Sequence, residues 1–166
     1  HRGAVVNWQG DSPLIPPRWI HQLVEEIGTG IDVATPIQLC SAEQANALKM
    51  DFMTGQPGGT MAVVDHAFRA LYFSKAPIPS RGPWWFHIGL YAYSARALES
   101  YGTEESVLER SEKLEQLRFL ERAVEVRCVP VDGAPIWEVN NPPDVAKVAG
   151  LIGGGNETAR THGRRR

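Results

Sequence analysis

The chain has 166 residues, of which 43% are hydrophobic and 22% charged, and a formal net charge of −2. This length suits one domain, and the near-neutral charge excludes the basic surface typical of nucleic-acid-binding proteins and a strongly charged tail or membrane-facing stripe. No apolar stretch approaches the roughly 20 residues that span a membrane and there is no signal peptide, so we expect a cytoplasmic protein without membrane partners.

The first predicted element is a buried strand in the apolar run that begins at Val5 and stops at Asp11. Its acidic end lies at the edge where open α/β sheets bind ligands. A helix is predicted to enter at Pro17 and end at Gly28. Its spacing predicts a buried face made of Ile20, Leu23, Val24 and Ile27.

The middle of the chain predicts strands with one short helix between them. Residues 31–39 predict a strand, in which Pro36 indicates an edge or a kink. The sequence Ser-Ala-Glu-Gln at 41–44 is a possible capping box for a helix through Lys49. Two apolar runs beyond the loop at 54–59 predict a hairpin with a five-residue connection: Met61–Val64 and Ala70–Phe73.

A single strand is predicted from Trp84 to Tyr93, after the proline-rich segment 76–83. Strand alternation places His87, Gly89, Tyr91 and Tyr93 on one face and Ile88, Leu90 and Ala92 on the other. His87 and Tyr91 then project together across the gap left by Gly89. This pair would suit a sugar hydroxyl or a carboxylate, although a buried histidine and tyrosine with satisfied hydrogen bonds is the alternative.

The last third predicts a helix over 95–101, a long helix from the capping box at Ser106 to about Val124, a strand over 125–131 and a helix over 144–152. The glycine-rich, basic residues 153–166 predict a disordered tail. Strands alternating with helices favour an α/β layer fold, with one domain over 1–152.

The predicted long helix has two distinct faces. One face is expected to pack into the core: Leu114, Leu117, Leu120 and Val124. The opposite face carries Leu108, Glu112, Glu115 and Phe119. Such a face either lines a cleft, with the two carboxylates directed at a polar ligand, or simply faces solvent.

Asp11 is open to two interpretations, since an acidic residue after a strand can hold Mg²⁺ or cap the following turn. Zinc-ligand spacing, a nucleophile elbow, GxGxxG and Walker A patterns are absent from the sequence.

Four stretches occur in the order and near the spacing of one family: VVNWQGDSPLIPP at 5–17, ALYFSKAPIP at 70–79, HIGLYAY at 87–93 and SVLERSEKLEQLR at 106–118. They resemble the bacterial sugar-acid cytidylyltransferases, most closely the 3-deoxy-manno-octulosonate (Kdo) cytidylyltransferase family. The resemblance implies a three-layer nucleotidyltransferase-like α/β fold with a mixed, mostly parallel sheet and helices on both faces. It also implies homodimers that pair through a hairpin around residues 60–80.

The activity implied by the resemblance is transfer of CMP from CTP to a sugar acid, most closely Kdo, for lipopolysaccharide precursor synthesis. The family motifs imply sugar-acid contacts from Gln9, His87, Tyr91, Glu115 and Gln116. Asp11 matches a catalytic, metal-binding aspartate that uses Mg²⁺. Asn140 aligns with a second metal-binding aspartate, and its amide oxygen can coordinate Mg²⁺ but brings no charge.

The family's arginine- and lysine-containing loop, which cradles the CTP phosphates, has no counterpart in these 166 residues. We therefore expect the sugar-acid-binding portion of a larger domain, with an incomplete N-terminal half and no full activity by itself. The alternatives are a catalytically degenerate binding or dimerisation module, and a cytidylyltransferase for another sugar acid.

Overall fold

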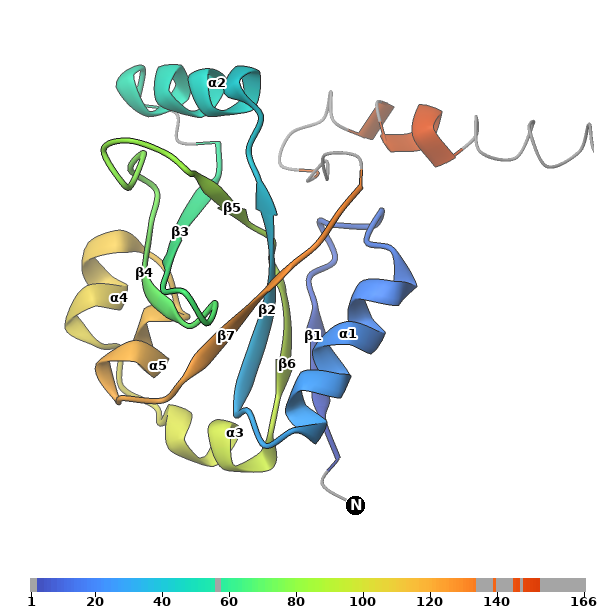
Figure 1. The fold of residues 1–166 in the computed structure, drawn as a ribbon, viewed down its shortest axis with the longest axis vertical. Helices are drawn as coiled ribbons and strands as arrows, with labels where there is room; N and C mark the ends of the chain where they lie inside the picture. The colour runs from blue at the N-terminus through green and yellow to red at the C-terminus, as the bar shows by residue number, and fades with distance from the viewer. Residues whose placement is uncertain (1–2, 56–57, 134–138, 140–144, 147, 153–166) are drawn as a thin grey trace, which may run out of the picture.

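A computed structural model describes residues 3–55, 58–133, 139, 145–146 and 148–152 (Figure 1). The predicted tail at 153–166 lies outside the described residues. The elements, in chain order, are β1 (Val5–Trp8), α1 (Pro17–Gly28), β2 (Val33–Leu39), α2 (Ala42–Met53), β3 (Thr60–Val64), β4 (Ala70–Ser74), β5 (Trp85–His87), β6 (Leu90–Tyr93), α3 (Ala95–Tyr101), α4 (Val107–Glu112), α5 (Leu117–Glu121) and β7 (Val126–Pro130).

The strands form one sheet in the order β1-β6-β2-β5-β3-β4, with β7 paired to β2. The predicted α/β class is confirmed, but the expectation of a mostly parallel sheet is wrong for the described strands. Only β2 and β7 pair in parallel there, whereas the other pairings are antiparallel. The reason is that β6 is inserted, antiparallel, between β1 and β2, which run in the same direction and are joined by α1.

The predicted strand from Trp84 to Tyr93 is interrupted. Ala34 pairs with Ala92, but Ile37 pairs with His87, so the register shifts between β6 and β5. Pro36 lies in β2 opposite this interruption, is fully buried, and accepts a hydrogen bond from the Ile88 N–H at 3.1 Å. It is therefore not at an edge, because β2 is paired on both sides. A proline has no N–H for the ladder, and an irregularity in the partner strand is where that loss matters least.

Helices cover both faces of the sheet, as predicted (Figure 1). The face under α1 is packed with Ala34, Ile88, Leu90 and Ala92, and α1 contributes Trp19, Leu23 and Ile27. The prediction of the buried face of α1 is partly wrong, because Val24 is 39% exposed and Trp19 is buried instead. The opposite core includes Tyr91, Tyr93, Leu117, Phe119 and Val126. The predicted alternation of the β6 side chains is thus confirmed.

The long helix predicted from Ser106 to Val124 is two helices, α4 and α5. Lys113 adopts a left-handed conformation (φ 58°, ψ 42°) and ends α4. Arg118 of α5 forms an ion pair with Glu109 of α4. Nine residues of continuous helix would separate these two residues by about 13 Å along the axis, so their contact requires the break. The helical phase that placed Glu112, Glu115 and Phe119 on one face therefore does not hold.

The other local sequence signals agree with the structure. The hairpin of β3 and β4 and both capping boxes, at Ser41 and Ser106, are present. Helix α2 continues past the predicted end at Lys49 to Met53. The described residues 145–146 and 148–152 are helical, in agreement with the predicted helix over 144–152.

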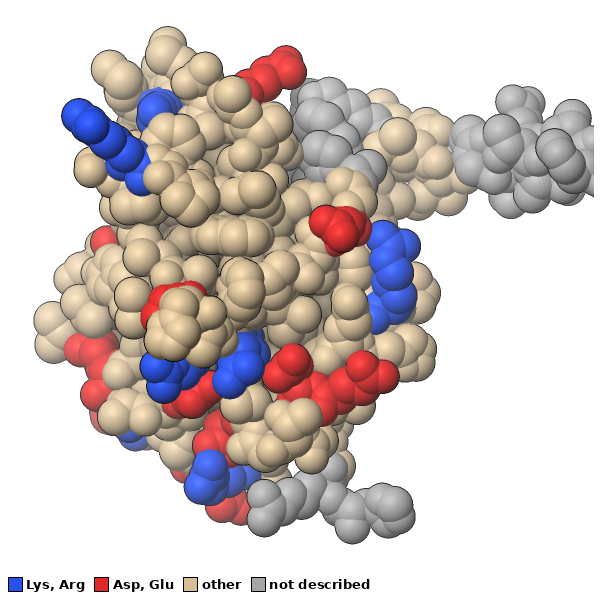
Figure 2. Space-filling model, viewed as in Figure 1, with Lys and Arg blue, Asp and Glu red and all other residues tan. Residues whose placement is uncertain are grey.

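On the face seen in Figure 2, acidic and basic side chains alternate over the lower half and neither sign forms a continuous stripe. Within the part of the chain that the structure describes, no helix has the length and apolar character needed to cross a bilayer.

Candidate functional site

The predicted ligand-binding residues Gln9, His87 and Tyr91 lie at the end of β1 and along β5 and β6. Antiparallel pairing sets Trp8 opposite Leu90 and thereby places Gln9 beside Gly89. The Gln9 amide fills the space where a Cβ of residue 89 would stand, with Cδ 3.0 Å from that position. The space left by Gly89 is therefore occupied by the Gln9 amide, and a glycine is required at position 89 for this contact.

His87 is buried (5% exposed) and its ring lies between two aromatic side chains. The ring centroids are 5.1 Å from Phe73 and 5.4 Å from Tyr91, and Nε2 lies 2.9 Å from Thr35 Oγ1. Burial lowers the pKa of His87 to about 3. The imidazole is therefore neutral at neutral pH, and it can exchange hydrogen bonds with hydroxyl groups but cannot offer a positive charge.

This low pKa predicts how stability changes with pH. The ordinary pKa of a histidine is 6.5, whereas that of folded His87 is about 3, so the unfolded chain takes up a proton first as the pH falls. The free energy of unfolding should therefore fall by about 2 kcal/mol between pH 7 and pH 5 because of this group. His87→Gln, whose amide can still donate to Thr35, should lose this part of the pH dependence in urea titrations. An equal slope in both proteins would contradict the prediction.

Tyr91 is buried (2% exposed) and stacks on Tyr93 with ring planes 10° apart. Burial raises the pKa of Tyr91 well above its ordinary value, and the neighbouring Tyr93 and Glu115 raise it further. The phenol therefore stays protonated. Because the Glu115 carboxylate also raises the pKa of Tyr93, it contributes negative charge to this group of tyrosines.

The turn between α4 and α5 carries the predicted pair Glu115 and Gln116. Glu115 is exposed, whereas Gln116 is buried (3% exposed) at the start of α5. Glu112, predicted from the helical face to meet a ligand, instead accepts hydrogen bonds from Ser74 Oγ (2.7 Å) and the Tyr72 hydroxyl (3.3 Å) of β4. Of the two predicted carboxylates, only that of Glu115 acts on Tyr91 and Tyr93.

Asp11 follows β1 and is half-buried. Its carboxylate accepts a hydrogen bond from Ser12 Oγ at 3.2 Å, and its backbone carbonyl accepts one from the Val139 N–H at 2.8 Å. The predicted partner Asn140 lies outside the described residues. Among the residues described, no group of three or more His, Cys, Asp or Glu side chains could hold a metal ion. An Asp11 site would therefore depend on other oxygen ligands.

Two further interactions near the site were not predicted. Thr35 contacts His87, and the pair Glu109–Arg118 holds α4 against α5, with Arg118 nitrogens 2.6 and 2.7 Å from the carboxylate oxygens. The capping box at Ser106 predicts a structural role for Glu109, but no local pattern connects it to Arg118.

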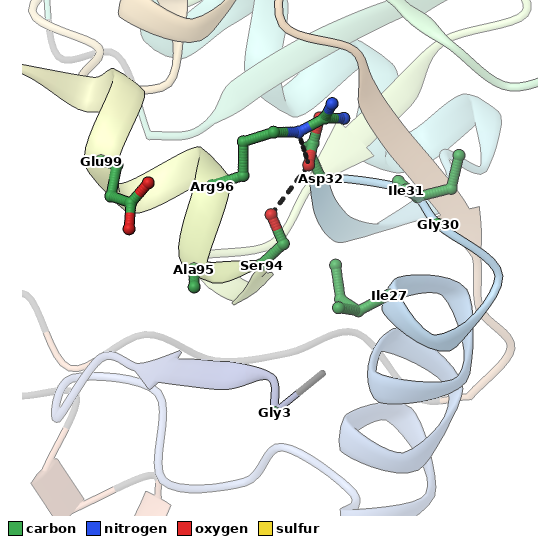
Figure 3. Close-up of a pocket in the computed structure, with 9 residues that line it drawn as sticks. All are labelled: Gly3, Ile27, Gly30, Ile31, Asp32, Ser94, Ala95, Arg96 and Glu99. Carbon is green, nitrogen blue, oxygen red and sulfur yellow. Dashed lines mark hydrogen bonds and ion pairs between the residues drawn. The ribbon is translucent and has the colours of Figure 1, made fainter. Parts of the chain in front are cut away.

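A cavity of about 410 Å³ lies at the other end of β1 (Figure 3). It is bounded by Gly3, the end of α1 and the start of α3, and it contains Asp32, which accepts hydrogen bonds from Ser94 (2.8 Å) and Arg96. None of the predicted site residues that the structure describes lines this cavity.

An α/β sheet with buried polar groups at a strand end is the architecture of many nucleotide- and sugar-handling enzymes. No family model matches the chain. It is 38% identical over 159 residues to 3-deoxy-manno-octulosonate cytidylyltransferase of Maricaulis maris, covering 89% of this chain and 61% of that protein. The Paramagnetospirillum magneticum enzyme of the same name is 37% identical over 157 residues, covering 90% of this chain and 60% of that protein.

A solved structure of CMP:2-keto-3-deoxy-manno-octonic acid synthetase complexed with CTP superposes with a TM-score of 0.78 and 31% sequence identity, covering 92% of this chain and 62% of that one. Over about nine tenths of its length, the chain is similar to 3-deoxy-manno-octulosonate cytidylyltransferases. It spans about three fifths of the length of the relatives it matches.

Proposed function

We propose that the protein containing this chain transfers CMP from CTP to a sugar acid, most closely Kdo, and that this chain supplies the sugar-acid contacts. The observation that carries the proposal is the convergence of Gln9, His87 and Tyr91 at one end of the sheet. Support comes from the relatives named for this reaction and from the similar structure described in complex with CTP. Because CTP is a cytoplasmic metabolite, we place the reaction in the cytoplasm.

In the proposed reaction the anomeric hydroxyl of the sugar acid attacks the α-phosphate of CTP and pyrophosphate leaves. The protein's contribution to such a transfer is mainly positioning and charge neutralisation. A neutral His87, a protonated Tyr91 and the Gln9 amide suit hydrogen bonds with sugar hydroxyls. Glu115 and Gln116 are proposed to complete these contacts from the turn between α4 and α5.

We propose that Asp11 binds Mg²⁺, with Asn140 as a second oxygen ligand. The residues fit this ion, because the Asp11 carboxylate is half-buried and, among the described residues, accepts a side-chain hydrogen bond from Ser12 alone, at 3.2 Å. Mg²⁺ favours such sites, where one or two carboxylates and several waters complete its shell. When bound, the ion neutralises charge on the phosphates. The backbone contact between Val139 and Asp11 supports the pairing with Asn140.

We further propose a homodimer formed through the β3–β4 hairpin. The supporting observation is Leu71 of β4, which is 60% exposed. A dimer would cover this apolar edge. Light scattering at micromolar concentration tests the proposal, and a monomer would contradict it.

The test of function uses the product of the whole reading frame that contains these residues, beside the 166-residue chain. Each is mixed with CTP, Mg²⁺ and Kdo, with sialic acid or an amino analogue of Kdo as competing substrates. We expect pyrophosphate release and a CMP-sugar product, detected by mass spectrometry, from the whole reading frame with Kdo preferred. Failure of the whole product to form any CMP-sugar, together with no Kdo binding by the chain in calorimetry, would overturn the proposal.

Gly89→Ala tests the contribution of Gln9. The new methyl group would take the space of the Gln9 amide, which is the end of a flexible side chain and can move away. We expect the free energy of unfolding to change by about 1 kcal/mol or less, while Kdo binding weakens about tenfold because an oriented hydrogen bond is lost. Gly28→Ala, at a position where a Cβ meets nothing within 4 Å, is the control. Unchanged Kdo affinity in Gly89→Ala would argue against a role for Gln9.

A further inference from the structure

Thr35 lies in β2 beneath His87 and is completely buried. Its Oγ1 is 2.9 Å from His87 Nε2, 2.9 Å from the Leu90 carbonyl oxygen and 3.3 Å from the Ile88 carbonyl oxygen. These groups belong to the interruption between β5 and β6, opposite Pro36, which has no N–H to offer. The Thr35 hydroxyl therefore provides a donor at a point where the backbone lacks one.

The proton of this hydroxyl can be assigned by counting donors. Carbonyl oxygens only accept, so the single hydroxyl proton is directed at a carbonyl, and the Leu90 carbonyl is the closer. The Thr35 oxygen then accepts from His87 Nε2, which must carry the ring proton. In the opposite arrangement the oxygen would face two carbonyl oxygens with no proton between them, which is unfavourable in a buried site.

With the proton on Nε2, the neutral ring has an acceptor at Nδ1. No described residue forms a hydrogen bond with Nδ1. The buried polar side-chain atoms without a partner, among the described residues, are Trp19 Nε1 and Arg127 Nε. Nδ1 of His87 is not one of them, so this atom is not fully enclosed, although His87 as a whole is only 5% exposed.

We propose that Thr35 is a positioning residue that holds His87 as the Nε2–H tautomer, so that Nδ1 accepts a hydrogen bond from a hydroxyl group of the sugar acid. This inference takes its class of ligand, a sugar acid, from the proposed function. It also decides between the two partners considered for His87. A carboxylate has only acceptors and would be repelled by the bare Nδ1, so His87 recognises a hydroxyl group and another residue receives the carboxylate.

The test combines nuclear magnetic resonance with binding. The 166-residue chain is labelled with ¹⁵N-histidine, and His87→Gln assigns the His87 ring signals among the five histidines. The wild-type chain should show a protonated Nε2 and an unprotonated Nδ1. Thr35→Val, which keeps the shape but removes the hydroxyl, should lose this single tautomer and weaken Kdo binding about tenfold. Thr35→Ser should restore both.

Thr29→Val is the matched control, because the Thr29 hydroxyl donates to the Glu26 carbonyl (2.7 Å) at the distant end of α1. It should change neither the tautomer nor Kdo affinity. A proton on Nδ1 in the wild-type chain overturns the proposal even if Thr35→Val fails to fold, and so does an unchanged tautomer in a folded Thr35→Val. If the tautomer behaves as expected but the wild-type chain does not bind Kdo, the control of the tautomer by Thr35 stands, and the proposal that this chain supplies the sugar-acid contacts fails.

Discussion

Arg118→Met is expected to lower the free energy of unfolding by about 3 kcal/mol. Arg118 and Glu109 are both buried, with side chains 8% and 11% exposed, and two short hydrogen bonds join them. Arg118 also donates to the Gly102 carbonyl (3.1 Å) and lies 4.0 Å from the centre of the Tyr101 ring. The methionine would keep much of the packing but leave the Glu109 carboxylate buried without its partner. Urea unfolding followed by tryptophan fluorescence measures the change.

The control for this substitution is Arg122→Met. Arg122 is exposed and its guanidinium donates a hydrogen bond to the Ser100 carbonyl (3.0 Å), so we expect a loss of less than about 1 kcal/mol. The double variant Glu109→Gln with Arg118→Met should be more stable than the sum of the single losses predicts, because it leaves no buried charge. If Arg118→Met costs no more than Arg122→Met, the ion pair does not hold α4 against α5.

The Glu109–Arg118 ion pair also predicts that the free energy of unfolding depends on pH, with a sign set by the pKa of Glu109. Arg118 lowers the pKa of Glu109 below its ordinary 4.5. The stabilisation is therefore fully present above about pH 4.5 and is lost as the pH falls through the lower pKa of the folded state. Wild type should lose this increment in acid, whereas Arg118→Met should not.

Asp11→Asn is expected to lower the proposed cytidylyl transfer by about 100-fold or more in kcat, because the amide cannot replace the anionic ligand of Mg²⁺. Stability should change by no more than about 0.5 kcal/mol, since the 3.2 Å contact with Ser12 is the only side-chain hydrogen bond of Asp11 among the described residues. Assays of the whole reading-frame product over a range of Mg²⁺ concentrations measure the effect. Asp51→Asn, an exposed aspartate of α2, is the control.

Asn140→Asp, at the proposed second ligand, is expected to have the opposite effect on activity. An added carboxylate should tighten Mg²⁺ binding and raise activity, because it helps to neutralise the triphosphate. If Asp11→Asn keeps its metal-dependent turnover, Asp11 is a turn cap and the proposed metal site is wrong.

Much of this fold follows from local sequence signals. The capping boxes at Ser41 and Ser106 begin helices because the hydroxyl and the third residue satisfy exposed backbone N–H groups within one turn. Alternation over residues 90–93 correctly separates the two faces of β6, since successive side chains point to opposite sides of a strand. The family motifs likewise follow from the order of residues alone.

Other features depend on contacts between residues distant in sequence. The break at Lys113 has no glycine or proline to mark it, and it allows Arg118 to reach back to Glu109. The antiparallel insertion of β6 between β1 and β2 is set by packing across the sheet, which local periodicity does not encode.

The candidate site divides in the same way. Gln9, His87 and Tyr91 can be recognised from their motifs. The neutral state of His87 cannot be predicted from them. That state depends on burial between Phe73 and Tyr91, and the hydroxyl that contacts the ring belongs to Thr35, 52 residues away in the chain. Sequence thus determined which side chains are available for chemistry. The tertiary structure decided their protonation and their partners, because desolvation and hydrogen bonding arise only when distant strands meet.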